Sequence, residues 1–558
     1  MKNSTYMRSL RIAYRVLRAS TRGYPRWNDF IENTPDDWPP EPSIEGSGKN
    51  ILMATSVGSH LAVNAVDSCI AAALTLRGNN VHALLCDRDL PACLACEAGW
   101  YSNDGEFAQR GPSKSVCIGC FKPSARMFDT LGIPVRSYGQ MLNEKDRKDA
   151  TSIAESLPFD CISSFKDDGI ALGEHAMAGA LRYFAKGSLE DEPHAEAILR
   201  RYFEAAILTL RATKKILSDL NIDVVVAHHG IYVPQGIIAE TARSMGVRVV
   251  TWNPAYRKKC FIFSHDTTYH HTMMDEPVSL WEGVHLTPEL LEKTRSYLAG
   301  RAIGKDDWIW FHDRPEFSGG QALRELGVKS ELPVIGLLTN VIWDAQLHYR
   351  PNAFPTMTNW LLDSIEYFAN RPEMQLVIRV HPAERTGAIK SRETVEEIIT
   401  RAFPKLPDNV FVIGSANPVS TYAIIPHFNA ALIYGTKTGI EITCMGKPVI
   451  VAGEAWIRGK QLTKDASSPE EYFEFLNELP YSGELDKDTI HRGFKYAFHF
   501  FFRRMIPLDF MEPLSGWPPY RVNLSSMDDL RPGRYKGLDV ICEGIESGAQ
   551  FIYPAEAE

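Results

Sequence analysis

Residues 430–441 read AALIYGTKTGIE, and residues 446–450 read GKPVI. The apolar run 430–434 predicts a short buried strand, and the glycine and threonines after it predict the start of a helix. The run at 446–450 predicts that a second strand follows quickly. The N-terminus of a helix presents unpaired backbone N–H groups and the positive end of a dipole, which suit a phosphate group. This stretch therefore predicts an α/β fold with a phosphate-binding turn.

The turn itself supplies candidate ligand contacts. We expect Thr436, Lys437 and Thr438 to bind a phosphate group, and Glu441 to accept a hydrogen bond from a ribose hydroxyl. The alternative is a glycine turn with a threonine N-cap, which uses the same backbone N–H groups.

A strand upstream points to the same edge of the sheet. Residues 375–380 read QLVIRV and predict a buried strand, with His381-Pro382 directly after it. Open α/β sheets bind ligands at the carboxyl ends of their strands. We therefore expect His381 to donate a proton or a hydrogen bond to a departing phosphate, and Arg379 and Arg385 to contact that phosphate. A purely structural histidine at the strand end is the alternative.

Size and composition limit the class of protein. A chain of 558 residues is too long for one ordinary core, so two large domains are expected. The net charge of −9 gives no overall argument for nucleic-acid binding. The sequence has no run of about 18 apolar residues, so it predicts no membrane-spanning helix. No signal peptide is recognised. The expected location is the cytoplasm.

The N-terminal segment, residues 1–48, stands apart from the rest. Apolar residues recur at helical spacing beside a stripe of arginines, and residues 36–42 predict a linker. A basic amphipathic helix can lie on an anionic bilayer, which predicts a peripheral position at the inner face of the membrane. A helix packed on its own domain is the alternative. The apolar and arginine positions are Met7, Leu10, Tyr14 and Leu17, and Arg8, Arg11, Arg15, Arg18 and Arg22.

Two series of alternating strands and helices follow. Residues 49–325 predict a first Rossmann-like domain for an acceptor, and residues 326–490 predict a second for a nucleotide sugar. The dinucleotide fingerprint GxGxxG with a downstream acid is absent, which weakens a dehydrogenase interpretation. Residues 491–558 predict an aromatic helix and a tail. That helix either crosses back onto the first domain or forms an interfacial patch for a lipid-linked acceptor.

With these motifs the chain resembles bacterial capsule and surface-polysaccharide biosynthesis proteins of the GT-B type, which include transferases that use CMP-linked Kdo. The resemblance covers mainly residues 330–506 and implies two Rossmann-like domains that face each other across a cleft. Related GT-B sialyltransferases use an HP motif and a Ser/Thr pair to hold CMP, and His381-Pro382 with Thr436 and Thr438 is similar to these. An acidic pair before a glycine supplies their base, and Asp167-Asp168-Gly169 is similar, which nominates Asp168. GT-B enzymes generally need no catalytic metal.

Two further strand ends supply catalytic candidates. Asp344 follows the predicted strand 334–338, beside Trp343 and Asn340, and is expected to contact donor or acceptor. His229 follows the predicted strand 223–227 and is expected to face the cleft as a catalytic or acceptor-binding group. The alternatives are a turn or cap residue for Asp344 and structural packing for His229.

Four cysteines predict a metal site inside the first domain, in an insertion at residues 86–125. Cys93 and Cys96 form one CxxC pair, and Cys117 and Cys120 form a second. That spacing predicts one structural zinc in a zinc-ribbon-like tetrathiolate. An iron–sulfur cluster uses the same ligands, and four unrelated buried thiols are the third interpretation. Cys86 is a substitute ligand.

Together these features predict a glycosyltransferase. It moves a sugar from a nucleotide-activated donor, with CMP a candidate nucleotide, to a glycan or lipid-linked acceptor in surface or capsular polysaccharide synthesis. Two enzyme alternatives on the same fold are a polyol-phosphate transferase and a nucleotide-sugar 2-epimerase. A non-catalytic, zinc-stapled subunit of a capsule assembly or export machine is a third alternative.

Overall fold

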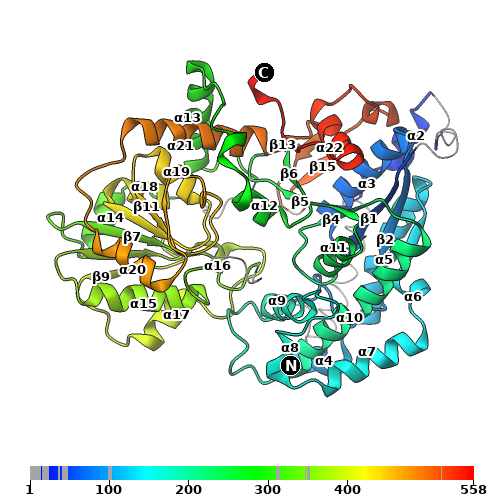
Figure 1. Cartoon of the computed structure of the whole chain (residues 1–558), viewed down its shortest axis with the longest axis horizontal. Coiled ribbons are helices and arrows are strands. Elements are labelled where there is room, and N and C mark those ends of the chain that lie inside the picture. The colour runs from blue at the N-terminus through cyan, green and yellow to red at the C-terminus, as the bar shows by residue number, and fades with distance from the viewer. Residues whose placement is uncertain are drawn as a thin grey trace.

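A computed structural model describes residues 14, 24–35, 38–39, 48–98, 103–308, 315–345, 347, 352–516 and 518–557. Two α/β halves lie side by side (Figure 1). The predicted membrane-binding stripe of the N-terminal segment, apart from Tyr14, lies outside the described residues. In the described part of the chain, no helix has the length and apolar character needed to cross a membrane.

The first domain is built on a seven-stranded sheet in the order β13-β6-β5-β4-β1-β2-β3. Strands β1 to β5 run parallel, whereas β6 is antiparallel to β5 and β13 is antiparallel to β6. The strands are β1 (Asn50–Ser56), β2 (Asn80–Leu85), β3 (Val135–Ser137), β4 (Val224–His228), β5 (Arg248–Pro254), β6 (Cys260–His265) and β13 (Ile506–Pro507).

Helices cover this sheet because its strands are apolar along almost their whole length and need burial on both faces. The sequence of residues 194–220 predicts one long helix, and the structure confirms it as α10. The main helices are α3 (Leu61–Leu76), α4 (Asp104–Arg110), α5 (Lys114–Thr130), α7 (Glu144–Ser156), α9 (Leu172–Phe184), α10 (Ala195–Asp219), α11 (Gln235–Ser244) and α12 (Tyr269–Asp275).

The second domain has a six-stranded sheet in the order β12-β11-β10-β7-β8-β9, and all its pairings are parallel. Its strands are β7 (Val334–Leu338), β8 (Gln375–Arg379), β9 (Val410–Ile413), β10 (Ala430–Ile433), β11 (Val449–Val451) and β12 (Lys464–Asp465). Its helices include α14 (Gly319–Glu325), α15 (Met357–Ala369), α16 (Ala383–Thr386), α17 (Val395–Ala402), α19 (Thr438–Cys444) and α20 (Pro469–Asn477). The strands and the helix predicted around residues 430–450 are confirmed.

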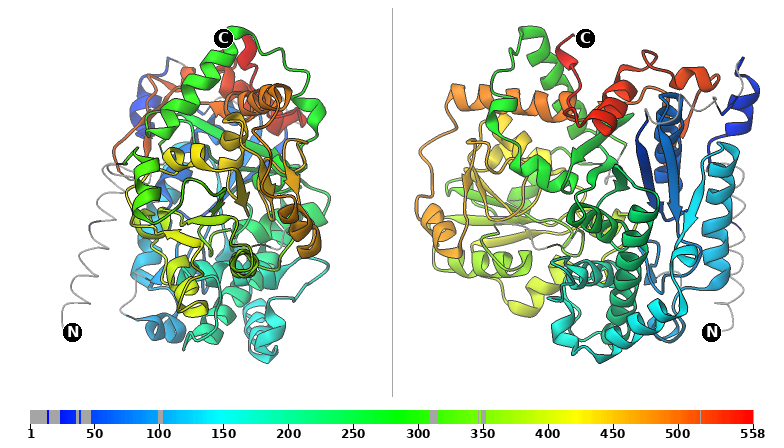
Figure 2. Two further views of the ribbon diagram at one scale, coloured as in Figure 1. Left: turned by 90° about the vertical axis from the view of Figure 1, so that its left-hand side faces the viewer. Right: turned by 45° about the vertical axis from the view of Figure 1, so that its right-hand side comes forward.

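The chain then returns to the first domain. Helix α21 (Lys487–Phe498) runs beside α13 (Pro288–Ala302) and continues as a π-helix over His499–Arg503 (Figures 1 and 2). Strand β13 follows and pairs with β6. The aromatic side chains Phe498, Phe500, Phe501 and Phe502 are buried. Residues 487–507, called the crossing segment below, are therefore part of the core between the domains.

No zinc ribbon is seen among the described residues of the segment 86–125. Residues 104–110 and 114–130 form helices α4 and α5, and both Cys117 and Cys120 lie on α5. A ribbon needs extended strands around its knuckles, whereas α4 and α5 bury Phe107 and Phe128 as part of the first domain.

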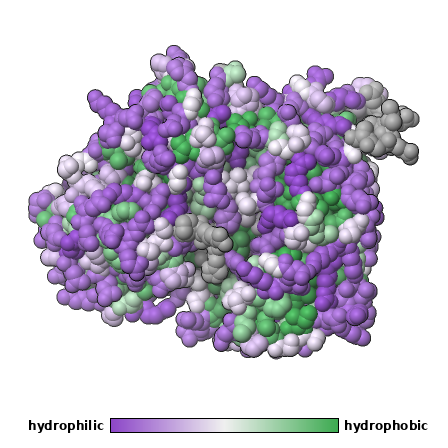
Figure 3. Space-filling model, viewed as in Figure 1, coloured by the Kyte–Doolittle hydropathy of each residue, from purple (hydrophilic) through white to green (hydrophobic). Residues whose placement is uncertain are grey.

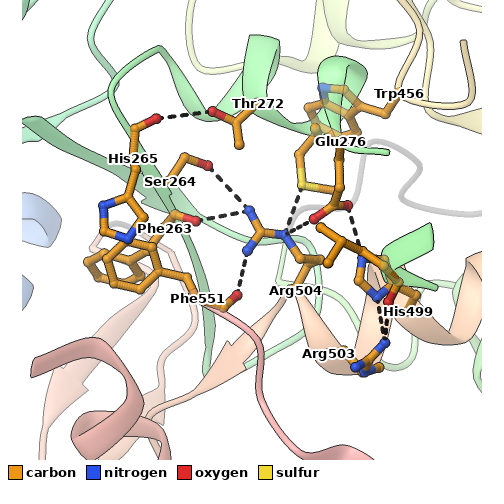
Figure 4. Close-up of polar contacts among 12 residues, drawn as sticks. Phe263, Ser264, His265, Thr272, Glu276, Trp456, His499, Arg503, Arg504 and Phe551 are labelled. Carbon is orange, nitrogen blue, oxygen red and sulfur yellow. Dashed lines mark hydrogen bonds and ion pairs between the residues drawn. The ribbon is translucent and has the colours of Figure 1, made fainter. Parts of the chain in front are cut away.

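A buried ionic cluster joins the domains at the crossing segment. Glu276, which follows α12, accepts a hydrogen bond from Nε2 of His499 at 2.9 Å and lies 3.2 Å from Nε of Arg504 (Figure 4). The side chain of Lys460, from the second domain, donates to the backbone carbonyls of Met274 and Glu276 at 2.7 Å each. Both domains thus anchor on the end of α12.

We expect Glu276→Gln to lower the free energy of unfolding by about 3 kcal/mol. Loss of the carboxylate leaves the buried Arg504 guanidinium without its counter-ion. The matched control is Glu282→Gln, because Glu282 pairs with Arg492 at 3.1 Å in an exposed position and should contribute about 0–1 kcal/mol. Urea denaturation measures both variants, and equal losses would contradict the importance of the buried cluster.

Candidate functional site

A cavity of about 850 Å³ lies between the two domains. The second domain lines it with residues that follow β7, β8, β10 and β11. The first domain lines it with residues from β5, α9 and α12 and with residues that follow β4. The space-filling view shows the hollow between the two halves, with apolar side chains among polar ones (Figure 3). The carboxyl ends of parallel strands from both sheets therefore contribute to one site, as in open α/β sheets.

Seven of the ten predicted catalytic and donor-binding residues line this cavity. They are His229, Asp344, Arg379, His381, Thr436, Lys437 and Thr438. The remaining three, Asp168, Arg385 and Glu441, do not line it.

His381 is held in one orientation by its neighbours. Its backbone N–H donates to the hydroxyl of Thr339, and its Nδ1 accepts a hydrogen bond from the backbone N–H of Ala383 at 3.1 Å. Because Nδ1 acts as the acceptor, the proton of the neutral ring is on Nε2. That tautomer is the one needed for a group that donates to an anion.

The turn after β10 is also fixed. Asn340, which follows β7, accepts a hydrogen bond from the backbone N–H of Gly435 at 3.1 Å. The hydroxyl of Thr436 contacts the hydroxyl of Thr438 at 3.0 Å and accepts from the Thr438 N–H at 3.3 Å. Two neighbouring strand ends therefore hold this turn in place.

Lys437 is the cation of this turn. Its Nζ lies 4.4 Å from the centroid of the Tyr256 ring, a cation–π contact. Burial, and then the positive charge of Arg301, lower the pKa of Lys437 to about 8. A partly desolvated ammonium group that lines a cavity binds an anion more strongly than an exposed one does.

Arg379 lines the cavity, but its guanidinium is used within the protein. It donates to the carbonyl oxygens of Gly414, Asn417 and Val419 at 2.6, 3.3 and 3.0 Å. Only 2% of the residue is exposed. Arg379 therefore holds the loop after β9 against the site.

The three predicted residues that do not line the cavity are paired within the protein. Glu441 is buried and pairs with Nε of Arg301 at 2.6 Å, and Arg385 donates to Ser415 at 3.2 Å. Asp168 lies at an exposed turn and pairs with Lys214 at 2.7 Å.

His229 has the strained backbone typical of functional sites. Its φ is +66°, in the left-handed region that non-glycine residues rarely adopt. Its ring packs between Tyr232 and Tyr269, and its Nδ1 is buried with no hydrogen-bond partner. Burial lowers the pKa of His229 to about 4, although the Asp344 charge acts in the opposite direction. The ring is therefore neutral at pH 7 and can accept a proton.

Asp344 comes from the second domain, and its negative charge acts on His229 of the first. The hydroxyl of Tyr232 donates to Asp344 at 2.8 Å and accepts from the backbone N–H of Ala345 at 2.7 Å. These two bonds join the first domain to the loop after β7. The site is thus complete only with the domains together.

Sequence reasoning missed a second group of lining residues: Tyr256, Tyr269, His270, Glu454 and Trp456. Glu454 follows β11, so the rule applied to His381 would have found it. His270 and the aromatic residues come from irregular segments and a short helix, which the strand pattern does not mark.

The predicted metal ligands gather only in part. Sγ of Cys93 lies 4.0 Å from Sγ of Cys96, and Sγ of Cys120 accepts from the backbone N–H of Ser59. Burial, and then the neighbouring Cys93 and Cys86, raise the pKa of the Cys117 thiol. Within the described residues, no three His, Cys, Asp or Glu side chains have an arrangement that could hold a metal ion.

Residues 328–480 match the family model described as capsule polysaccharide biosynthesis protein. The second domain carries this family's sequence pattern. The resemblance predicted from the motifs is therefore confirmed over that segment, which includes His381 and the 435–441 turn. A comparison with curated proteins finds no match.

Similarities to solved structures are weak. The β-Kdo 2,4 transferase KpsC of Thermosulfurimonas dismutans is 15% identical over 50% of this chain and 79% of its own, with a TM-score of 0.32. A UDP-GlcNAc 2-epimerase from Neisseria meningitidis is 10% identical over 80% and 94%, with a TM-score of 0.23. A glycosyltransferase from Rickettsia africae is 11% identical over 81% and 93%, with a TM-score of 0.25. With all three TM-scores below 0.5, we infer no activity from them.

Anion binding in the cavity should depend on the charge of Lys437. Because burial depresses its pKa to about 8, the positive charge is present at pH 7 and is lost as the pH rises through about 8. We expect the affinity for CMP, measured by calorimetry, to fall roughly tenfold between pH 7 and pH 9.5, where the CMP phosphate, with a second pKa of about 6, is mostly doubly charged. Lys437→Arg should remove this dependence because arginine stays charged. The same pH dependence in the variant would assign it to another group.

Proposed function

We propose that the protein is a GT-B glycosyltransferase of surface or capsular polysaccharide synthesis. It transfers a sugar from a nucleotide-activated donor, CMP-linked in the first instance, to a hydroxyl of a glycan or lipid-linked acceptor. The observation that supports this most directly is the convergence of His381, Lys437 and the Thr436–Thr438 turn with His229 and Asp344 in one cavity between two domains. The capsule-family match of the second domain supports the biological setting.

The second domain holds the donor in this proposal. The ammonium of Lys437 and the hydroxyls of Thr436 and Thr438 contact the phosphate, and Nε2–H of His381 donates to the same group. Negative charge grows on the phosphate as the glycosidic C–O bond breaks. A donor fixed at that position therefore stabilises the transition state more than the ground state.

The first domain activates the acceptor. The neutral imidazole of His229 takes the proton from the acceptor hydroxyl while that oxygen attacks the anomeric carbon and the nucleotide leaves with the bonding electrons. Asp344, close to His229, stabilises the resulting imidazolium. The proposal needs no catalytic metal. A contact between Glu441 and a ribose hydroxyl stays a prediction that needs the carboxylate to leave Arg301, because Glu441 is buried and does not line the cavity.

Nucleotide binding is the first test. We expect one of CMP, UDP, GDP and CDP, supplied at 100 times its dissociation constant, to raise the unfolding midpoint, since such binding stabilises a native state by about 2.7 kcal/mol. Thr436→Val keeps the side-chain shape but removes the hydroxyl, so it should weaken the shift. Glu484→Gln, an exposed change in the same domain, should leave it intact. If none of the four nucleotides shifts the wild type, the proposal fails and a non-catalytic role is favoured.

Turnover separates the roles of two residues. With the donor found in that screen, His381→Ala should lower kcat by about 10²-fold or more and change nucleotide affinity far less. Thr436→Val should mainly raise KM. If His381→Ala keeps the wild-type kcat, the residue only ends the strand, and catalysis must be assigned to His229 and Asp344.

The cysteine pairs are proposed to hold one structural zinc through Cys93, Cys96, Cys117 and Cys120. The short Cys93–Cys96 distance supports this, and a change of side-chain rotamers is needed to bring the α5 thiols to the same ion. Elemental analysis of aerobically purified protein should find about one zinc per chain, and Cys117→Ser should lose it. Cys161→Ser, at an exposed thiol, is the control. A folded, metal-free wild type would exclude the site. Iron in place of zinc in the analysis would indicate an iron–sulfur cluster.

Attachment of the arginine-rich N-terminal segment to an anionic membrane surface remains part of the proposal. It would bring the enzyme to a lipid-linked acceptor.

A further inference from the structure

One wall of the cavity contains a carboxylate that the catalytic scheme does not use. Glu454 lies three residues after β11, with 6% of its surface exposed. Its Oε1 accepts from Nδ2 of Asn352 at 3.3 Å, and its Oε2 lies 3.5 Å from Nε2 of His270. Both contacts are long for a buried carboxylate, which can accept about four hydrogen bonds. Burial raises the pKa of Glu454, and the contact with His270 opposes this rise.

The neighbours of Glu454 show which part of the cavity its unused hydrogen-bond acceptor sites face. The side chain of Asn352 also lines the cavity, and its Oδ1 is buried without a hydrogen-bond partner. Nδ1 of His270 accepts from Nε1 of Trp456 at 3.0 Å, so its ring proton is on Nε2, facing Glu454. The wall therefore combines two acceptor side chains with one imidazole donor.

Aromatic rings complete this wall. Trp456 lies 6.0 Å from Tyr256 and 6.1 Å from Tyr269 between ring centroids. Rings of this kind pack against the C–H face of a sugar, while acceptors and donors at the rim bind its hydroxyls. Each hydroxyl both donates and accepts, so two adjacent hydroxyls match the Glu454 carboxylate and the His270 N–H.

We propose that Glu454, Asn352 and His270 form a recognition site for a pair of adjacent hydroxyls on a sugar ring, against the Trp456 and Tyr256 rings. This inference rests on the proposed function and names the part of the donor that this wall binds. The ring is either the ribose of the nucleotide or the transferred sugar, since both carry such hydroxyls. His270 comes from the first domain and Glu454 from the second, so the ligand bridges the domains when it occupies the site.

The test is calorimetric binding of matched ligands to wild type, Glu454→Gln and His270→Asn. The ligands are CMP, 2′-deoxy-CMP and CMP-Kdo, with UDP, 2′-deoxy-UDP and UDP-GlcNAc as the second set. Glutamine keeps the size of glutamate but replaces one acceptor oxygen by a donor. Glu484→Gln is the control for loss of one charge in the same domain. Circular dichroism and the unfolding midpoint establish that each variant is folded.

If the site binds the ribose, wild type should bind the 2′-deoxy nucleotide about tenfold more weakly than the nucleotide, and Glu454→Gln should bind both with the same reduced affinity. If it binds the transferred sugar, Glu454→Gln should bind the nucleotide as wild type does but bind the nucleotide sugar about tenfold more weakly. His270→Asn should follow the same pattern in either case.

Two outcomes overturn the inference. Equal affinity of wild type and Glu454→Gln for every ligand excludes a contact, and an equal loss for every ligand assigns Glu454 a structural role. Both of these leave the proposed function standing, because wild type still binds a nucleotide. Wild type that binds none of the six ligands overturns the proposed function and this inference together.

Discussion

The arrangement of the two domains depends on one buried carboxylate. Glu276 ends α12 and meets His499 and Arg504 from the crossing segment, and its backbone carbonyl binds Lys460 of the second domain. Buried charges are costly unless they are paired, so these contacts define one relative position of the segments that meet there. The same helix begins beside the cavity with Tyr269 and His270. An ionic contact outside the site thus positions the wall on which the ligand lies.

A second set of contacts closes the opposite side of the cleft. Arg392 pairs with Asp104 at 2.7 Å and with Glu192 at 3.1 Å, and Tyr232 binds Asp344. The cavity is therefore bridged at the crossing segment and at its far side. Burial desolvates both Lys437 and His229, which strengthens the electrostatic effect of Lys437 and keeps His229 neutral.

The sequence predicted the strands and the helices well because the second sheet is parallel throughout, the first is parallel over β1 to β5, and both are buried. Short apolar runs at 334–338, 376–378 and 430–433, each followed by polar or turn residues, indicate buried strands, and their carboxyl ends mark His381, Asn340 and the 435–441 turn. Asp168 was nominated by a three-residue similarity, and the structure places it at an exposed turn. Glu441 has the spacing for a ribose contact, but spacing does not reveal that Arg301, 140 residues away, pairs with it. Contacts between distant segments, such as His270 with Glu454, leave no local pattern.

Strand β13 has a consequence for the synthesis of the chain. Its partner β6 ends at His265, whereas β13 begins at Ile506, about 240 residues later. At about 5–20 residues per second, a ribosome needs roughly 12–50 seconds to make the intervening chain. During that time the outer edge of β6 has no neighbour in its sheet, and unpaired strand edges are templates for pairing with other chains. The first domain therefore depends on a late part of the chain to cover its own edge, and a nascent protein that stalls within the second domain exposes that edge to aggregation.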